Sequence, residues 1–81
     1  MNVHETVLKI FTSHFEVSAD DISATTTMED LELDSLELVE LSLVIEEEFG
    51  VKFSDEQLAQ RSLNVGGLCE AISARLGAGA R

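Results

Sequence analysis

The sequence lacks tryptophan, tyrosine and proline, and it contains only four phenylalanines and one cysteine among 81 residues. A single cysteine, Cys69, excludes an internal disulfide and offers no ligand spacing for a metal ion. No apolar run approaches the roughly 20 residues that a membrane-spanning helix needs, and the N-terminus carries no apolar signal region. Without proline, and rich in Leu, Glu and Ala, the chain favours helices throughout. These features predict a single all-α domain that is cytoplasmic, monomeric and not bound to a membrane.

Positive charge is also scarce, since the formal net charge is −11. From Glu16 to Glu48 the sequence has twelve acidic residues and no Lys or Arg. A field of this sign repels nucleic acid and attracts basic protein surfaces. We therefore expect basic protein partners and no nucleic acid, with solubility as the alternative reason for the charge. The basic residues all lie outside the acidic span: Lys9, Lys52, Arg61, Arg75 and Arg81.

Apolar periodicity predicts four helices, at residues 3–15, 35–49, 55–60 and 65–76. Asn2, Asp34 and Ser54 each precede a Glu or Gln by three residues, which is the capping-box pattern of a helix start. Residues 16–33 form a long loop, and loops of this length tend to be functional or to contain a short helical turn. Residues 77–81 are expected to be a frayed tail. The stripe expected to be buried comprises Val3, Val7, Leu8, Ile10, Phe11 and Phe15 in the first helix, and Val65, Leu68, Cys69, Ile72 and Leu76 in the last.

The second helix has two distinct faces when it is stepped at 100° per residue. The face expected in the core holds Leu38, Leu41, Ile45 and Phe49, and the opposite face holds Glu37, Glu40, Glu47 and Glu48, with Val44 among them. Leu36, Val39 and Leu43 lie between the two faces. Leucines beside carboxylates predict a docking surface, in which an apolar spot packs and the acids steer a partner. Glu46, Glu47 and Glu48 oppose the helix dipole without a local gain, which also indicates a functional surface.

Ser35 stands at the mouth of this helix. If Asp34 supplies the cap with Glu37, Ser35 is the first helical residue and its hydroxyl is free to face solvent. A hydrolase nucleophile is excluded, because no G-x-S-x-G surrounds Ser35 and the histidines, His4 and His14, are in the first helix. The acidic clusters lack the glycine and spacing of an EF-hand, so no specific metal site is expected.

The most specific motif is MEDLELDSL at residues 28–36, followed by VEL at 39–41 and EEEFG at 46–50. On this motif and the order of its helices, nearly the whole chain resembles the discrete, type II acyl carrier proteins. The resemblance implies one carrier domain over residues 1–81, folded as a four-helix bundle with a short third helix. It also implies a carrier that serves enzymes and has no catalytic residues of its own.

The resemblance implies that Ser35 is the attachment site of 4′-phosphopantetheine, with Asp34 and Leu36 beside it. A phosphopantetheinyl transferase would move the group from coenzyme A, and Asp34 would help the transferase complex to bind Mg²⁺. The thiol of the arm would then carry acyl chains as thioesters. The resemblance further implies acyltransferases, ketosynthases and reductases as partners, which would contact Leu36, Glu37, Glu40, Leu43, Glu46 and Glu47. An acyl pocket between the second and third helices would have Val39, Leu41, Ser42 and Ile45 as its walls.

The sequence departs from the family pattern at Glu32, where many members have glycine, and at Gly67, where an acid often starts the last helix. Neither departure touches the attachment chemistry. Fatty acid synthesis and polyketide or other secondary-metabolite synthesis both remain open. The alternatives are a D-alanyl or other specialised carrier, and an unmodified acidic helical adaptor that would need the acids but not Ser35.

Overall fold

The computed structural model describes residues 2–79, and within them every regular element is a helix. The elements are α1 (Val3–His14), the 3₁₀ helix η1 (Ala19–Asp21), α2 (Ser35–Phe49), α3 (Asp55–Leu58) and α4 (Val65–Gly79). The predicted all-α fold with a short third helix and a long first loop is therefore confirmed. The long loop contains one helical turn, η1, as expected for a loop of this length.

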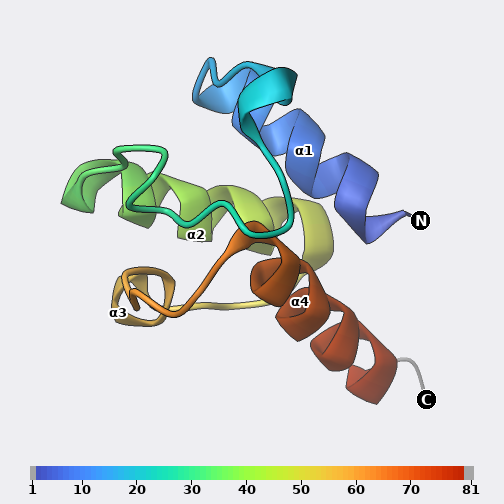
Figure 1. The fold of residues 1–81 in the computed structure, drawn as a ribbon. Coiled ribbons are helices and arrows are strands. Elements are labelled where there is room, and N and C mark those ends of the chain that lie inside the picture. Colours follow the sequence, from blue (N-terminus) through green and yellow to red (C-terminus); the bar gives the residue numbers. More distant parts are fainter. Residues whose placement is uncertain (1, 80–81) are drawn as a thin grey trace.

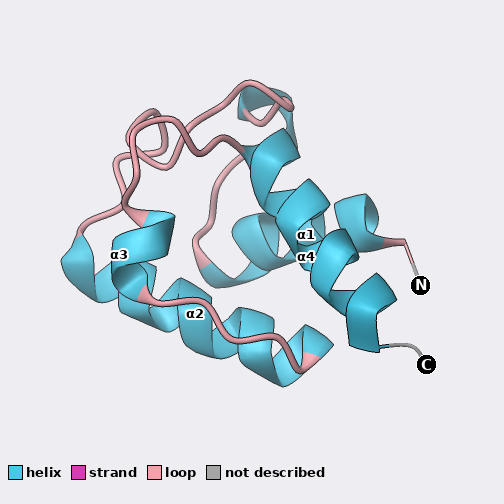
Figure 2. Cartoon of the chain, turned by 90° about the horizontal axis from the view of Figure 1, so that it is seen from below, coloured by secondary structure: helices cyan, strands magenta, loops and turns pink. Residues whose placement is uncertain are grey.

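Figure 1 shows how the helices surround α2. α1 and α4 lie toward the C-terminal half of α2, whereas the short α3 lies beside its N-terminal half. The long loop leaves the end of α1 and returns across the molecule to the start of α2. Figure 2 shows the same arrangement after a quarter turn, with the start of α2 and α3 on one side and the first turn of α1 and last turn of α4 on the other. The start of α2 thus lies at the end of the domain that is remote from both of those terminal turns.

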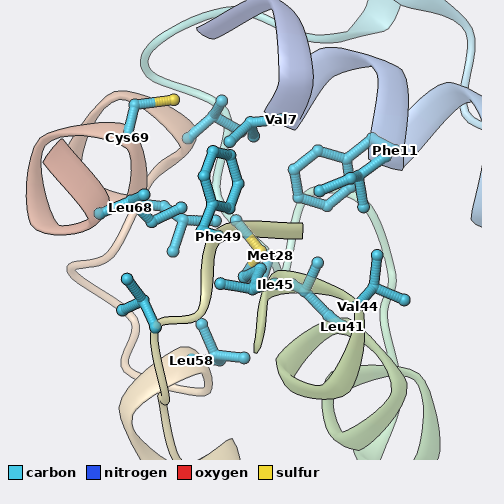
Figure 3. Close-up of a cluster of buried hydrophobic side chains, with 14 of the residues drawn as sticks. Val7, Phe11, Met28, Leu41, Val44, Ile45, Phe49, Leu58, Leu68 and Cys69 are labelled. Carbon is cyan, nitrogen blue, oxygen red and sulfur yellow. The ribbon is translucent and has the colours of Figure 1, made fainter. Parts of the chain in front are cut away.

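One hydrophobic core holds the four helices together. Figure 3 shows side chains of α1, α2, α3 and α4 meeting in it, with Met28 from the long loop. Phe11, Ile45, Leu58, Leu68 and Ile72 are fully buried there. Burying a side chain of this kind is worth about 1.5–3 kcal/mol, so these contacts hold the helices together.

The prediction was wrong for two apolar residues. Val44 was assigned to the acidic side of α2, yet it is buried, because α1 lies over that side and Val44 lies toward Phe11 (Figure 3). Leu8 was assigned to the buried stripe of α1, yet it is exposed. In both cases the buried arc is set by the neighbouring helix, which periodicity within one helix does not locate.

Helix ends were predicted within a few residues. Asn2 caps α1 as expected, accepting from the Glu5 N–H at 3.1 Å. α3 ends at Leu58 rather than at residue 60, and α4 continues to Gly79 where an end at Leu76 was expected. Of the expected frayed tail, residues 77–79 are helical, and residues 80 and 81 lie outside the described residues.

A close backbone contact joins the long loop to the start of α4. The N–H groups of Val65 and Gly66 donate to the carbonyls of Thr26 and Ala24, each at 2.8 Å. A Cβ on Gly66 would lie 3.0 Å from the Ala24 oxygen, so any larger residue would push the loop away from α4. Gly66, which from sequence alone only weakens the first turn of α4, therefore anchors the loop that leads to Ser35.

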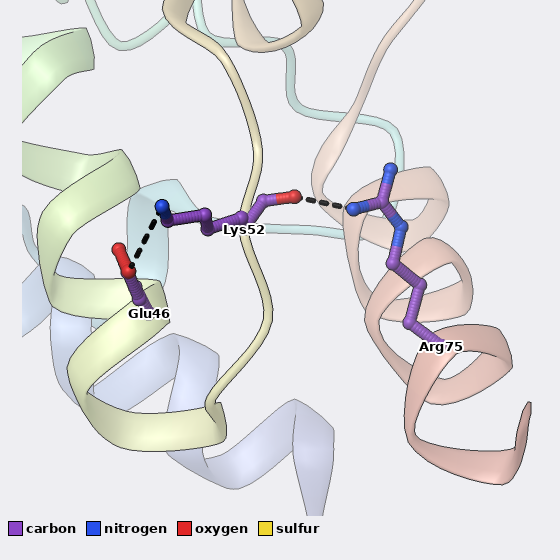
Figure 4. Close-up of polar contacts among 3 residues, drawn as sticks. All are labelled: Glu46, Lys52 and Arg75. Atoms are coloured by element: carbon purple, nitrogen blue, oxygen red, sulfur yellow. Dashed lines mark hydrogen bonds and ion pairs between the residues drawn. The ribbon is translucent and has the colours of Figure 1, made fainter. Parts of the chain in front are cut away.

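A second tie links α4 to the segment between α2 and α3 (Figure 4). The Arg75 guanidinium donates to the Lys52 carbonyl and stacks over the Phe53 ring, 4.4 Å from its centroid. The Lys52 ammonium lies 3.8 Å from a Glu46 carboxylate oxygen. Glu46, which was expected to oppose the helix dipole without a local gain, thus has one ion pair, although an exposed pair of this kind contributes only about 0–1 kcal/mol.

Candidate functional site

The start of α2 is closed by a complete capping box. The Glu37 N–H donates to Asp34 Oδ1 at 2.8 Å, and the Asp34 N–H donates to Glu37 Oε1 at 3.2 Å. This confirms the predicted cap, and it makes Ser35 the first residue of the helix. Ser35 is exposed, and within residues 2–79 its hydroxyl makes no hydrogen bond. The hydroxyl is therefore available to a reagent or to another protein.

The same helix end offers donors to an anion. The Leu38 N–H donates to the Asp34 carbonyl at 2.9 Å, so the cap residue satisfies the third and fourth amides of the turn. In the described part of the chain the amides of Ser35 and Leu36 have no acceptor. Free amides and the positive end of the helix dipole both favour a negative group at this position.

The segment that leads into α2 is tightly folded. Thr27 and Asp30 exchange two hydrogen bonds of 3.0 Å, and the Leu33 N–H donates back to the Met28 carbonyl at 3.3 Å. Glu32 has a φ of +57°, in the left-handed region that favours glycine. A side chain there costs roughly 1–2 kcal/mol. The sequence departure at Glu32 thus falls on a backbone position where glycine would be less strained.

A hollow of about 380 Å³ opens beside Ser35, and we call it the Ser35 hollow. Its apolar lining comes from Met28, Leu33 and Leu38, with Ala59 from the end of α3. Its charged lining comes from Glu29, Asp34 and Arg61. Sequence reasoning missed this hollow, because its walls come from three segments that only the packing of α3 against α2 brings together. Nothing in the local pattern around Arg61 marks it as a neighbour of Ser35.

Several residues of the predicted docking surface are exposed on α2. The side chains of Leu36 and Leu43 are 80% and 59% exposed, and Val39 is 42% exposed. Glu40 and Glu47 are exposed beside them. The other two predicted acids differ, because Glu37 and Glu46 are half-buried and hold the Asp34 N–H and the Lys52 ammonium. Of these four acids, Glu40 and Glu47 are therefore the more exposed.

The four candidates for an acyl pocket do not form one surface. Leu41 and Ile45 are buried in the core, whereas Val39 is exposed and the Ser42 hydroxyl donates to the Val39 carbonyl at 2.7 Å. None of the four lines the Ser35 hollow. The cavity next to Ser35 is instead floored by Met28 and Leu38, both buried.

The remaining reactive groups lie apart from Ser35. His4 and His14 are exposed on α1, as expected for surface residues. Cys69 is buried in α4, and burial raises the pKa of its thiol, so it stays neutral near neutral pH. Among residues 2–79 no group of three or more His, Cys, Asp or Glu is placed to hold a metal ion. No helix in that range is both long and apolar enough to cross a bilayer.

Comparison with known proteins agrees with this geometry. Residues 5–72 match the family model described as "Phosphopantetheine attachment site". The chain is 44% identical over 66 residues to proteins called "Acyl carrier protein" from Nitratidesulfovibrio vulgaris strains DP4 and Hildenborough, covering 80% of this chain and 86% of each relative. It is 41% identical, with the same coverage, to the protein of that name from strain Miyazaki F.

Proposed function

Because this chain belongs to the acyl carrier protein family, whose members are carriers rather than enzymes and bear a covalent 4′-phosphopantetheine, we propose that Ser35 is the residue that holds this group. The observation that carries the proposal is that the cap of α2 and the exposed hydroxyl come from two different residues. Asp34 makes the cap, and the neighbouring hydroxyl of Ser35 is exposed and unpaired among the described residues. The serine can thus be modified without loss of the cap.

The residues around Ser35 suit the group chemically. The free amides of Ser35 and Leu36 and the helix dipole favour a phosphodiester on the Ser35 oxygen. In attachment, the Ser35 oxygen forms a bond to the phosphorus next to the pantetheine of coenzyme A. The pyrophosphate bond breaks, adenosine 3′,5′-bisphosphate leaves, and the hydroxyl proton passes to a base of the transferase. The bound group then supplies a thiol on which acyl chains are held as thioesters.

Asp34 has a carboxylate oxygen to spare for the transferase reaction. Its Oδ1 accepts the Glu37 N–H, and its Oδ2 has no hydrogen bond within residues 2–79. We propose that Oδ2 helps to hold Mg²⁺ when the transferase is bound, since magnesium prefers carboxylate oxygens and keeps part of its shell for phosphate.

We also propose that the exposed face of α2 is where partner enzymes dock. Leu36 and Leu43 supply the apolar contact, and Glu40 and Glu47 steer basic surfaces toward it. Glu37 and Glu46 contribute to the field while they keep their bonds within the chain. The partners would be a phosphopantetheinyl transferase, acyltransferases, ketosynthases and reductases, working in the cytoplasm on fatty acid or polyketide intermediates.

An acyl chain would enter the domain between α2 and α3, which pack against each other. Val39, Leu41, Ser42 and Ile45 remain the proposed walls, and burial of Leu41 and Ile45 means that the core must open to admit a chain. The Ser35 hollow, with Met28 and Leu38 below it, is the proposed mouth of that route.

Intact mass after incubation with coenzyme A, Mg²⁺ and a broad-specificity transferase tests the attachment. We expect one added phosphopantetheinyl group on the parent and none on Ser35→Ala. Ser18→Ala is the matched control, because Ser18 also precedes a helical turn, is exposed and makes no side-chain cap bond. A parent that gains no mass, while a known carrier is modified in the same mixture, would contradict the proposal and favour an unmodified adaptor.

A further inference from the structure

Arg61 differs from Lys52 and Arg75 in what its side chain contacts. Lys52 is paired with Glu46, and Arg75 is held by the Lys52 carbonyl and the Phe53 ring. Arg61 is exposed, and within residues 2–79 its guanidinium makes neither a hydrogen bond nor an ion pair. It is also the one basic residue that lines the Ser35 hollow.

The hollow keeps this guanidinium apart from nearby acids. Glu29 and Asp34 line the same cavity, yet neither pairs with Arg61. The cavity that these three side chains line has a volume of about 380 Å³, which is enough room for a phosphate group. An anion in the hollow would be repelled by two carboxylates, those of Glu29 and Asp34. The Arg61 guanidinium is the one cation in the lining that would attract it.

The attached arm brings such an anion. Its phosphodiester adds one negative charge to a chain whose net charge is already −11. The charge is fixed on the Ser35 oxygen, at the wall of the same hollow, and a tether of this kind gives a high effective concentration. A guanidinium presents its donors in a planar fork that matches phosphate oxygens in pairs.

We infer that Arg61 is a positioning residue for the arm, binding the phosphodiester on Ser35 in the hollow that both residues line. This inference rests on the proposed attachment at Ser35. The positive charge next to the phosphodiester would then come from the segment that connects α3 to α4, where Arg61 lies. Arg61 thereby offsets the repulsion of the phosphodiester by Glu29 and Asp34, and it fixes the root of an otherwise flexible arm.

The test compares apo and holo protein, the latter with a free thiol so that the phosphodiester is the only added anion. We expect attachment to raise the melting temperature of the parent by roughly 2–4 °C more than that of Arg61→Gln. Lys9→Gln is the matched control, because it changes the net charge equally at an exposed residue of α1 away from the hollow. The same difference between holo and apo in all three proteins would overturn the inference.

A nitrogen-resolved NMR spectrum gives a readout independent of stability. The Arg61 Nε–H signal, identified by its loss in Arg61→Gln, should shift and exchange more slowly on attachment, while the Arg75 signal stays in place. Arg61→Lys should keep part of the melting difference, which guards against a variant that merely folds poorly. Intact mass separates the two failures: no added group refutes the attachment at Ser35, whereas an added group with an unmoved Arg61 signal refutes only the role of Arg61.

Discussion

Two helices of this protein, α2 and α3, each start with a complete capping box and have a serine at that start, but the serine has a different role in each. At α3, Ser54 is itself the cap, and its hydroxyl accepts the Gln57 N–H at 3.1 Å. At α2, Asp34 is the cap and Ser35 follows it, so the Ser35 hydroxyl is left free. The comparison shows that availability of a helix-start serine is decided by the residue before it.

The largest expected effect concerns the residue that makes this difference. Asp34→Asn keeps a good capping side chain but removes the charge, and Asp34→Ala removes both. If Asp34 also holds Mg²⁺ for the transferase, both variants should be modified roughly tenfold or more slowly, as for other groups that support a metal site. Only Asp34→Ala should also lose about 1 kcal/mol of unfolding free energy. Initial rates of mass gain measure the modification, and urea denaturation measures the unfolding free energy. Equal modification rates for the parent and Asp34→Asn would contradict the role of Asp34 in metal binding.

The next effect is found by replacing each of the two serines with alanine. Ser54→Ala should lower the unfolding free energy by about 1 kcal/mol, because the Gln57 N–H loses its acceptor. Ser35→Ala should change it by less than about 0.5 kcal/mol, since an exposed residue without bonds is removed. The transferase should show the opposite order, modifying Ser54→Ala fully and Ser35→Ala not at all. Urea denaturation measures the two unfolding free energies. A larger loss in Ser35→Ala than in Ser54→Ala would contradict the roles given to the two serines.

A smaller effect is expected in the segment that approaches α2. Glu32→Gly relieves the left-handed φ of +57° but adds freedom to the unfolded chain, so we expect a net gain of roughly 0.5–1 kcal/mol. Glu29→Gly, on the same segment but without a positive φ, is the control and should gain nothing. A thermal melt of each variant is sufficient, and a loss at Glu32→Gly would mean that its side chain stabilises the loop.

The smallest effect should come from salt, because acidic residues precede α2 and a basic residue precedes α3. Glu29, Asp30 and Glu32 lead into α2, whereas Lys52 leads into α3. Raising the salt concentration from about 0.01 M to about 1 M shortens the screening length from about 30 Å to about 3 Å. The melting temperature should rise by several degrees, and exchange of the Glu37 amide should slow more than that of the Gln57 amide. A melting temperature that stays flat with salt would contradict this prediction.

The features that could be predicted from the sequence depend on interactions between residues that are close together in the chain. Each capping box joins residues three apart, so the caps of α2 and α3 and the free hydroxyl of Ser35 could be read locally. The stripe of α4 follows from helical periodicity, and its residues from Val65 to Ile72, including Cys69, are buried as predicted, whereas Leu76 is only partly buried.

The parts that could not be predicted depend on contacts between distant segments. Val44 is buried because α1 covers it, and Gly66 is favoured because Ala24, 42 positions earlier, approaches its backbone closely. The Ser35 hollow needs α3 beside α2 before Arg61 can face Ser35. Periodicity describes one helix at a time, so it carries no record of which neighbour covers which side.

The burial of Cys69 has a consequence for the cargo. A thioester exchanges readily with any nearby thiolate, and a free surface cysteine would take the acyl chain from the arm by transthioesterification. The only cysteine of this chain is buried in the core, and burial raises its pKa, so the competing thiolate is suppressed twice. The chain thus offers no accessible thiolate of its own to a thioester held on the arm.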